Sequence, residues 1–399
     1  MKILHVVPSY YPAVRYGGPI RSVHGLAKGL IGRGHEVHVF TTDVDGSGRS
    51  PVPLNEPVDM DGVSVWYFPT GLGRRLYRSP MMAYALHQRM NEYDIAHLHS
   101  VFLWPTSAAA SAARRVRVPY IVAPRGMLVG DLIRRKSRFA KTAWINLLEK
   151  RNLEGAAAIH VTSEIEANDF AALGLSHKRT FTIPNGVEMP CAARNSRIAQ
   201  PLLAELSSGP FILFLGRVNW KKGLDRLIPA MVDVCCGATL VIAGNDEEAY
   251  QPILEALAER TGITERMRFI GPLDDAEKWQ VLAQASLLVL PSYSENFGIV
   301  ALEAMMAGCP VIVTPEVGLA NIIRDVGAGL VVDGTPAELT RAINALLQAP
   351  EERRKMGEAG RRSARDKFSW DTIASDMEQI YRACVGEKRE CSKTSLPSS

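Results

Sequence analysis

Short apolar runs alternate with longer segments of helical spacing along almost the whole chain. The runs of the first half are Ile3–Val7, Glu36–Thr41, Val63–Phe68, Ile95–His99, Tyr120–Ala123 and Ala158–Thr162. Those of the second half are Phe211–Leu215, Thr239–Ala243, Arg268–Ile270, Leu287–Leu290, Pro310–Val313 and Gly329–Val332. Helical segments between them include Ile20–Gly32, Thr106–Arg115, Tyr250–Thr261 and Ala276–Ala283. Strands that alternate with helices form parallel sheets covered on both faces, so the pattern predicts an α/β fold.

The pattern occurs twice, and a turn signal at Pro184-Asn-Gly186 separates the two halves. We therefore expect two Rossmann-like, doubly wound parallel-sheet domains, residues 1–186 and 187–370. Residues 371–385 read as a final helix that can pack back on the N-terminal domain, and the polar tail 386–399 is expected to be disordered. Because ligands bind beyond the carboxyl ends of parallel strands, we expect the two domains to face a central cleft.

Composition supports a globular protein of two ordinary domains, with 399 residues, 47% hydrophobic and 22% charged. No apolar run reaches the roughly 18 residues of a membrane-spanning helix. The start, Met1–Pro8, is too short for a secretory signal and reads as a first strand. The six cysteines form no Cys-x-x-Cys pair and have no histidines at metal spacing. These features predict reduced thiols, a cytoplasmic location and no metal.

Charge is distributed unevenly between the two halves. Residues 1–150 contain 20 Lys and Arg against 10 Asp and Glu, a net charge of +10. The remaining residues contain 26 basic against 32 acidic side chains, a net charge of −6. A basic first half is compatible with an anionic membrane surface, a phosphorylated acceptor or nucleic acid. Charge alone does not choose among these three partners.

Two cations follow the predicted strand Phe211–Leu215. Arg217 comes after Gly216, and Lys222 comes before Gly223. A guanidinium fork and a mobile ammonium both suit phosphate oxygens. A solvated surface is the alternative, since Lys221 and Arg226 are close by in the sequence. The position directly after a strand favours phosphate binding.

Glu295 and Glu303 form the sharpest motif, with the turn Asn296-Phe297-Gly298 between them. The turn predicts that Glu295 lies in a loop and that a helix starts close behind it. Glu295 can then accept hydrogen bonds from sugar hydroxyls, while the amides after Gly298, beginning with Ile299, face a phosphate. Glu303, inside the helix, can bind a ribose diol. A buried ion pair is the alternative for Glu303, since its apolar neighbours require that it has a partner.

The loop after the first strand contains Arg15-Tyr-Gly17-Gly18-Pro19 and leads into an apolar helix. Two glycines let backbone amides approach a ligand, and Pro fits the first turn of a helix. A helix N-terminus of this kind can bind an anion, although an ordinary turn explains the pattern equally well. A G-x-G-x-x-G motif does not occur here, so nothing supports a dinucleotide site.

His97 and His99 lie at the end of the predicted strand Ile95–His99. Alternation places both on the same side, at the strand end where a site is expected. A metal site would need a third ligand, and the sequence offers none at suitable spacing. One of the two histidines is expected to be structural.

Residues 131–151 form a basic amphipathic segment. Arg134, Arg138 and Lys141 share one side of the predicted helix, and Trp144 lies toward the apolar side. A basic face with a Trp at its apolar edge is typical of helices on membrane surfaces. A helix packed on its own domain with a solvated face is the alternative.

Together these motifs resemble the retaining glycosyltransferases of family 4, which have the GT-B fold. The resemblance spans nearly the whole chain. It rests on the Gly-Gly loop, Gly216-Arg217 with Lys222-Gly223, Pro184-Asn-Gly-Val187, and the E-x7-E pair ending in Ala307-Gly308. It implies that the N-terminal domain binds the acceptor and the C-terminal domain a nucleotide-sugar.

The resemblance also implies roles for individual residues. The amides of the Gly17-Gly18 loop, Arg217 and Lys222 would hold the donor diphosphate. Glu295 would contact the donor sugar and Glu303 the ribose. Asn296, Phe297, Gly298 and Ile299 would form the donor-binding turn. Leu273 and Lys278, in a loop over Phe269–Lys278, would contact the base.

One residue departs from the pattern of the family. Many relatives have a His in a Thr-x-His-Gly segment, near the reacting carbon and phosphate of the donor. Here the segment reads Ala123-Pro-Arg125-Gly126, so Arg125 stands in the place of that His. An Arg neutralises phosphate but is no acid or base. His99 then remains as a candidate catalytic residue together with Arg125.

The sequence therefore predicts a retaining, metal-independent glycosyltransferase without a cofactor. It would move a hexose-type sugar from a nucleoside-diphosphate sugar to a saccharide or lipid-linked saccharide, as in exopolysaccharide or O-antigen synthesis. It would act in the cytoplasm, in peripheral contact with the inner face of an anionic membrane, without a nucleic-acid partner. The alternatives are a nucleotide-sugar epimerase or hydrolase of the same fold and a non-enzymatic polyanion- or membrane-binding protein.

Overall fold

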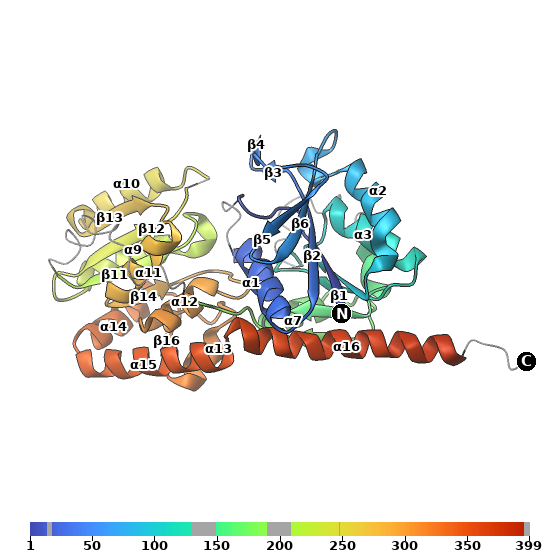
Figure 1. Cartoon of the computed structure of the whole chain (residues 1–399). Helices are drawn as coiled ribbons and strands as arrows, with labels where there is room; N and C mark the ends of the chain where they lie inside the picture. The colour runs from blue at the N-terminus through green and yellow to red at the C-terminus, as the bar shows by residue number, and fades with distance from the viewer. Residues whose placement is uncertain (14–17, 129–148, 190–208, 247, 395–399) are drawn as a thin grey trace, which may run out of the picture. The chain divides into compact units, whose positions relative to one another are not determined.

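The structure, a computed structural model, describes residues 1–13, 18–128, 149–189, 209–246 and 248–394, with side chains up to residue 387. The chain divides into two compact units (Figure 1). The first unit contains Met1–Gly186 and Trp370–Ser399, and the second contains Val187–Ser369. Each unit has its own sheet and its own buried core.

The first unit is built on an eight-stranded sheet in the order β10-β9-β8-β7-β1-β2-β6-β5. All neighbours are parallel except β5 and β6. The strands are β1 (Lys2–Val6), β2 (Glu36–Thr42), β5 (Pro57–Met60), β6 (Val63–Phe68), β7 (Ile95–His99), β8 (Tyr120–Ala123), β9 (Ala158–Val161) and β10 (Thr180–Thr182). A separate ribbon pairs β3 (Val44–Asp45) with β4 (Gly48–Arg49).

Helices cover both faces of this sheet, because successive strand residues point to opposite sides. Ile3 of β1 belongs to the core under α1 and α16, whereas its neighbour Leu4 belongs to the core under α2 and α3. The helices are α1 (Gly18–Gly32), α2 (Pro80–Arg89), α3 (Trp104–Arg115), α6 (Lys150–Glu154), α7 (Glu164–Ala171) and α16 (Trp370–Thr394). Single 3-10 turns are η2 (Arg74–Leu76) and η3 (Met90–Glu92).

The second unit has a six-stranded, fully parallel sheet in the order β13-β12-β11-β14-β15-β16. Its strands are β11 (Phe211–Leu215), β12 (Thr239–Ala243), β13 (Met267–Gly271), β14 (Leu287–Leu290), β15 (Val311–Val313) and β16 (Gly329–Val331). Its helices are α9 (Leu224–Ala230), α10 (Gln251–Thr261), α11 (Asp275–Gln284), α12 (Ile299–Ala307), α13 (Ala320–Val326), α14 (Pro336–Leu347) and α15 (Pro350–Lys367). Its 3-10 turns are η6 (Trp220–Lys222), η7 (Met231–Asp233) and η8 (Thr264–Arg266).

This architecture confirms the predicted fold class of two Rossmann-like parallel-sheet halves. Every apolar run singled out in the sequence is a strand. The sequence missed the two edge strands of the first sheet, β5 and β10, which are short and only partly buried. Edge strands carry a weak hydrophobic pattern because only part of their surface is covered. No helix in the described part of the chain is long and apolar enough to cross a membrane.

The C-terminal helix belongs to the first unit, where α16 and α1 lie side by side (Figure 1). Trp370, which the sequence assigned to the second domain, starts this helix within the first unit. Its ring packs against Gly25 and Gly186, which have no side chain. A Cβ on Gly25 would lie 2.1 Å from a ring carbon, and a Cβ on Gly186 would lie 2.6 Å from one. This corrects the expected boundary by one residue.

The same helix corrects the expectation of a disordered tail from residue 386. α16 continues to Thr394. The sequence Glu387-Lys-Arg-Glu-Cys-Ser-Lys393 contains neither Gly nor Pro, and it consists mostly of residues that favour helices. A single glycine, Gly386, costs only about 1 kcal/mol inside a helix, which does not end it.

Two glycines, Gly216 and Gly244, let the segments that follow β11 and β12 approach each other closely. Gly244 follows β12 with a φ of +148°, and an added Cβ would lie 1.9 Å from the carbonyl oxygen of Gly216. Gly216 in turn directly precedes Arg217. The contact is backbone to backbone, so no side-chain rotation can relieve it. The loop that presents Arg217 therefore depends on Gly244.

We predict that Gly244→Ala destabilises the second unit by about 3 kcal/mol or more, because it combines backbone strain with an unavoidable contact. Faster hydrogen exchange in peptides from β11 and β12 would measure the effect. Gly209→Ala is the matched control, since an added Cβ there meets no atom within 4 Å. Equal exchange in the two variants would contradict this prediction.

Candidate functional site

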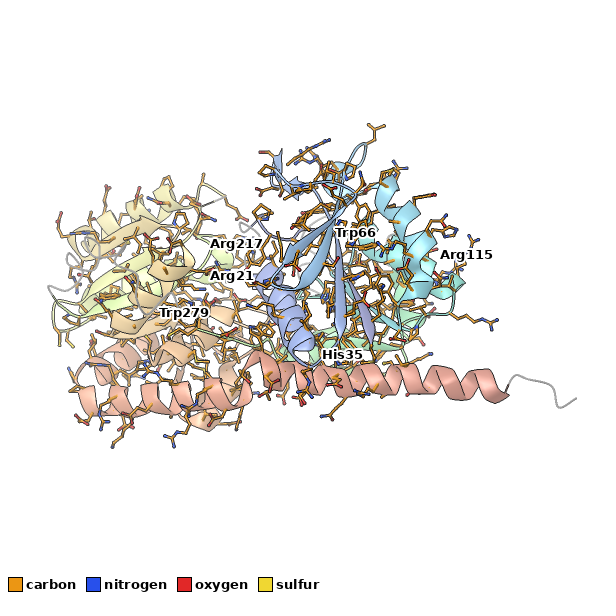
Figure 2. All side chains as sticks on the ribbon, in the orientation of Figure 1. Arg21, His35, Trp66, Arg115, Arg217 and Trp279 are labelled. Atoms are coloured by element: carbon orange, nitrogen blue, oxygen red, sulfur yellow. The ribbon has the colours of Figure 1, made fainter. Side chains whose placement is uncertain are left out.

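The second unit presents two cations after β11. Arg217 is exposed in the loop that follows the strand (Figure 2). Lys222 ends η6, which the Asn219 side chain caps by accepting a 3.1 Å hydrogen bond from the Lys221 amide. Gly223 then adopts a φ of +69° and turns the chain into α9. Arg217 forms no ion pair with any carboxylate in the part of the chain that the structure describes, so its guanidinium is available for a ligand.

Glu295 meets Lys222 directly. The Lys222 ammonium donates a hydrogen bond to Oε2 of Glu295, and both side chains are largely buried. The backbone of Glu295 is fixed as well, because its amide donates to the Glu316 carbonyl at 3.1 Å and its carbonyl accepts from the Gly318 amide at 3.0 Å. A carboxylate and an ammonium thus stand together at the start of the α12 segment.

The turn between Glu295 and α12 is rigid. Gly298 has a φ of +87° and precedes the first helical residue, Ile299. Phe297 anchors the turn in the core, and a Cβ on Gly318 would lie 2.1 Å from the Asn296 carbonyl oxygen. The first amides of an α-helix have no acceptor within the helix. They therefore form, with Lys222 and Arg217 nearby in the same unit, a set of donors suited to phosphate.

Glu303 lies inside α12 and pairs with a second lysine. Its Oε1 accepts a 2.6 Å hydrogen bond from Lys278 Nζ, and both side chains are less than a tenth exposed. Lys278 also lies 3.3 Å from Asp275. The buried ion pair that the sequence offered as an alternative for Glu303 is therefore present. It does not exclude ribose binding, because a carboxylate has two oxygens and several lone pairs.

The segment predicted as a base-contacting loop, Phe269–Lys278, is only partly a loop. Its first residues belong to β13, and its last residues belong to α11, which Asp274 and Glu277 start with a capping box. Leu273 lies in the short turn between them, half-buried against the core. Of the two residues predicted to contact the base, Leu273 lies in this turn, whereas Lys278 is directed at Glu303.

In the first unit, Arg125 and His99 are in contact. Arg125 Nη2 donates to His99 Nδ1 at 3.2 Å, and Nη1 donates to Asn185 Oδ1 at 2.9 Å. Arg125, two residues after the end of β8, has a φ of +56°, and Glu166 accepts a hydrogen bond from the following amide, that of Gly126. Arg125 is thus held by residues from three different segments of the chain.

The hydrogen bonds fix the tautomer of His99. Since an arginine can only donate, Nδ1 of His99 must accept, and Nε2 must carry the proton. That proton points to Nδ1 of His5, 2.9 Å away. Both nitrogens of His99 are therefore occupied, which makes it a residue that positions Arg125 and leaves it without a free nitrogen for acid–base chemistry.

A second chain of hydrogen bonds lies beside the first. His160 Nε2 donates to the Ile183 carbonyl at 2.9 Å, so its Nδ1 accepts from His97 Nε2 at 3.3 Å. Nδ1 of His97 must then accept from the hydroxyl of Tyr381 on α16, at 2.7 Å. The C-terminal helix is in this way connected to His97 and, through it, to His160.

Burial keeps these imidazoles neutral. Burial first, and then the charge of Arg125, lowers the pKa of His5 and of His160 to about 3. The same burial, followed by neighbouring imidazoles and Arg125, lowers the pKa of His97 and His99 well below the usual range. Burial also lowers the pKa of Arg125, but a guanidinium remains charged. Arg125 is thus the charged group of the cluster.

The structure supplies the third histidine that the sequence spacing lacked. Ring nitrogens of His5, His97 and His99 lie within 4.8 Å of one another, because β1 and β7 are neighbours in the sheet. The expectation that no third ligand lies near is therefore corrected. Hydrogen bonds already use most of these nitrogens, and the adjacent Arg125 guanidinium opposes a cation. The geometry suits a polar support better than a metal site.

The remaining predictions concern the Gly17-Gly18 loop and the basic helix. Gly18 is the first residue of α1, as expected for an amide at a helix N-terminus. Gly17 lies outside the described residues. The same holds for Arg134, Arg138, Lys141 and Trp144 of the predicted basic helix, so its amphipathic character stays a prediction.

Sequence reasoning missed several partners of the site residues. His5, Asn185 and Glu166 support Arg125 and His99, and Tyr381 supports His97. No local motif marks them. The one available signal is position: His5 lies near the end of a predicted strand, where parallel neighbours meet.

We predict that the first unit loses stability as the pH falls below about 6.5. Below this pH the histidines of the unfolded chain are protonated, whereas His5 and His160 of the folded chain stay neutral down to about pH 3. Each such group therefore lowers the free energy of unfolding by up to roughly 1.4 kcal/mol per pH unit. His5→Asn keeps an acceptor for His99 but cannot titrate, and it should flatten the pH dependence of the urea midpoint. His87→Asn, an exposed control, should not. Parallel curves for all three proteins would contradict this account.

Comparisons with known proteins agree with this arrangement. A family described as "Glycosyl transferase 4-like domain" matches residues 17–186, and one described as "Glycosyl transferases group 1" matches residues 202–363. A D-inositol 3-phosphate glycosyltransferase from Xylanimonas cellulosilytica is 27% identical over 96% of this chain and 95% of its own length.

Two solved structures share the fold. One is a sucrose-phosphate synthase from Thermosynechococcus elongatus, with a TM-score of 0.77, 23% identity, and coverage of 97% of this chain and 99% of that one. The other is Anabaena HepE in complex with UDP and glucose, with a TM-score of 0.76, 21% identity, and coverage of 96% and 100%. These likenesses show the GT-B fold, and the two family matches, which together cover most of the chain, show that it belongs to the glycosyltransferases of family 4.

Proposed function

We propose that this glycosyltransferase moves a hexose-type sugar, with retention at the anomeric carbon, to a hydroxyl of a lipid-linked saccharide. The observation that carries the donor half of the proposal is the pair of lysine–carboxylate contacts on one segment. Lys222 meets Glu295 just before α12, and Lys278 meets Glu303 within it. Cations for a diphosphate and carboxylates for hydroxyls are the groups that a nucleotide-sugar requires.

In this proposal Arg217, Lys222 and the first amides of α12 bind the diphosphate. Glu295 accepts hydrogen bonds from hydroxyls of the transferred sugar, and Glu303 accepts from the ribose. The contact between Lys222 and Glu295 supports a position for this ammonium between the sugar and the phosphate of the donor. Lys278 orients Glu303 through its hydrogen bond to Oε1, which is a positioning role.

The bond between the anomeric carbon and the phosphate oxygen breaks as the acceptor oxygen attacks from the same face. The acceptor proton passes to the departing phosphate, and the nucleoside diphosphate leaves. No protein nucleophile is required, so the contribution of the chain is electrostatic. Arg217 and Lys222 stabilise the charge that develops on the diphosphate, in place of a metal ion.

The part of the proposal that concerns the acceptor rests on the net charge of the first half of the chain. Residues 1–150 carry a net +10, which favours an acceptor that bears phosphate or lies at an anionic membrane, as in exopolysaccharide or O-antigen synthesis. Arg125 adds a cation that Asn185 and His99 orient. We place the enzyme at the cytoplasmic face of the membrane. Family membership favours transfer over the epimerase, hydrolase and polyanion-binding alternatives.

The donor site is tested with UDP, GDP, ADP and their sugars in a thermal-shift assay, with and without EDTA. UDP is the first choice, because the structurally similar HepE binds it. A nucleotide at 100 times its dissociation constant should stabilise the fold by about 2.7 kcal/mol. We predict that Lys222→Ala abolishes the shift and lowers the transfer rate by about 10²–10³, as loss of an oxyanion donor does.

Lys221→Ala is the matched control, because Lys221 directly precedes Lys222 in the same turn and its ammonium lies over the Trp220 ring. It should keep the nucleotide shift. The absence of a shift with every nucleotide would overturn the donor site. A shift that disappears with EDTA would overturn metal independence, and conversion of the donor without acceptor would favour an epimerase or hydrolase.

The Lys278–Glu303 pair gives a separate prediction. Lys278→Met leaves a buried carboxylate without its cation, which should cost about 3–5 kcal/mol of stability. The double variant Lys278→Met/Glu303→Gln should recover most of that loss, yet still bind the nucleotide-sugar poorly because the carboxylate is gone. Urea midpoints and nucleotide titrations measure the two effects separately.

Arg354→Met, which breaks an exposed pair with Glu351 and Glu358, is the control and should be nearly neutral. Full nucleotide affinity in the double variant would show that Glu303 has only a structural role.

A further inference from the structure

Exposed apolar side chains gather in one segment of the first unit. Leu72 is 90% exposed, Leu76 41%, Met81 47% and Tyr84 64%. Leu54, at 39%, is the one other large apolar side chain of the first unit that is exposed among the described residues. Single exposed apolar residues are ordinary, but four within thirteen positions of one segment call for a partner. We refer to this segment, residues 72–84, as the patch.

The patch has a charge of one sign. Residues 62–91 contain Arg74, Arg75, Arg78 and Arg89 and neither Asp nor Glu. Arg74 donates to the Ser47 carbonyl at 2.7 Å, and Arg89 pairs with Glu92. Arg75 and Arg78 are exposed and form no ion pair with a carboxylate of the described chain. Two arginines beside exposed leucines therefore remain available to an anionic partner.

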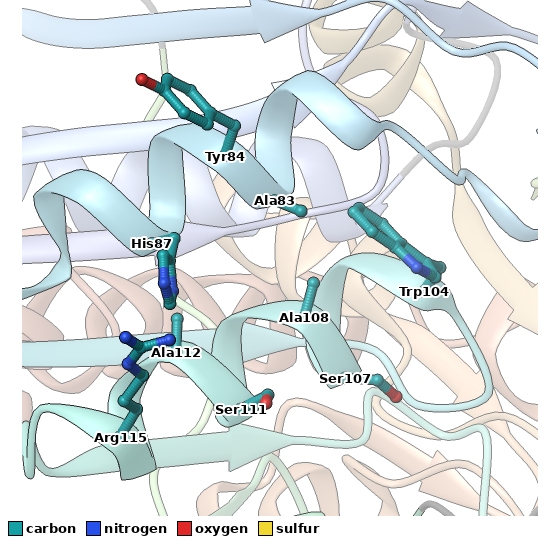
Figure 3. Close-up of a pocket in the computed structure, with 9 residues that line it drawn as sticks. All are labelled: Ala83, Tyr84, His87, Trp104, Ser107, Ala108, Ser111, Ala112 and Arg115. Carbon is teal, nitrogen blue, oxygen red and sulfur yellow. The ribbon is translucent and has the colours of Figure 1, made fainter.

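Next to the patch, a groove of about 600 Å³ lies between α2 and α3 (Figure 3). Small residues such as Ala108 and Ala112 keep the two helices from filling it. Trp104 lies at one end, and His87 and Arg115 lie together at the other. Arg115 is exposed at the end of α3 (Figure 2). An aromatic ring and a cation along one groove suit a lipid headgroup region, where aromatic rings and guanidinium groups both accumulate.

The segment also has a suitable place in the fold. It follows the carboxyl end of β6, and β6 is parallel to β2, β1 and β7. The residues after β6 therefore leave the sheet at the same edge as His99 at the end of β7. A surface that holds lipid at this edge would bring a lipid-linked acceptor to the side of the unit where Arg125 and His99 lie.

We infer that Leu72, Leu76, Met81 and Tyr84, with Arg75 and Arg78, form a surface that docks on an anionic phospholipid bilayer. We name this set the α2 surface. The leucines and Met81 enter the headgroup region, Tyr84 lies at its boundary, and the arginines bind lipid phosphates. The inference rests on the proposed function, because it supplies the membrane contact that a lipid-linked acceptor needs.

The test is flotation of the full chain with two kinds of vesicle, pure phosphatidylcholine and phosphatidylcholine with phosphatidylglycerol. The wild-type chain should bind only the second kind, and less at high salt. Arg75→Glu/Arg78→Glu should weaken binding at least about tenfold, since each basic residue near an anionic surface contributes about fivefold and the change also reverses the charge. Leu72→Ser/Leu76→Ser should weaken it too, because apolar side chains no longer insert.

Matched controls lie in the second unit. Arg260→Glu/Arg362→Glu makes the same change of charge at exposed positions, and Val232→Ser/Ile253→Ser removes exposed apolar groups. Both should bind vesicles as the wild type does. Every variant should keep the nucleotide thermal shift, which separates a failure of the α2 surface from a failure of the donor site.

The inference would be overturned by no binding of the wild type to anionic vesicles, by unchanged binding of both α2-surface variants, or by an equal loss in the controls. Loss only in Arg134→Glu/Arg138→Glu/Lys141→Glu would assign membrane contact to the predicted basic helix and also overturn it. Loss in the arginine variant without loss in the leucine variant would overturn insertion. Selective loss in both α2-surface variants would support it.

Discussion

The proposed donor site depends on two ion pairs that neutralise carboxylates in and just before one helix. An ionised carboxylate inside an apolar helix is costly unless a cation meets it. Lys278 meets Glu303 within α12, and Lys222 meets Glu295 just before it. These contacts orient both carboxylates, while the turn at Gly298 sets the direction of the helix N-terminus. Removal of either lysine would alter the arrangement of all these groups.

In the first unit the buried charge belongs to an arginine, and its histidine partner is neutral. Arg125 is surrounded by neutral imidazoles, whose hydrogen bonds orient it through His99. A parallel chain reaches from the Ile183 carbonyl to Tyr381 on α16. The C-terminal helix thus contributes to the support of His97, which lies 284 residues away in the sequence. A histidine in the place of Arg125 would bring a titratable group, whereas the arginine brings a permanent positive charge.

Much of the fold follows directly from the sequence. Buried parallel strands read as continuous apolar runs, so β11 and β14 are visible without a structure. Glycines and acidic residues near strand ends marked Arg217, Lys222, Glu295 and Glu303 as candidates, because parallel strands present their carboxyl ends on one edge. The edge strand β5 and the extension of α16 escaped prediction, since short or polar segments carry little hydrophobic pattern.

Periodicity and motifs were sufficient to predict the class of fold, the family and the residue types of the proposed donor site. The partners of these residues became clear only from the packing of the elements. Lys278 reaches Glu303 because α11 and α12 pack together, and His5 reaches His99 because β1 lies beside β7. The reason is physical: local periodicity fixes which face of an element is buried, whereas a contact between distant residues depends on the order in which elements pack.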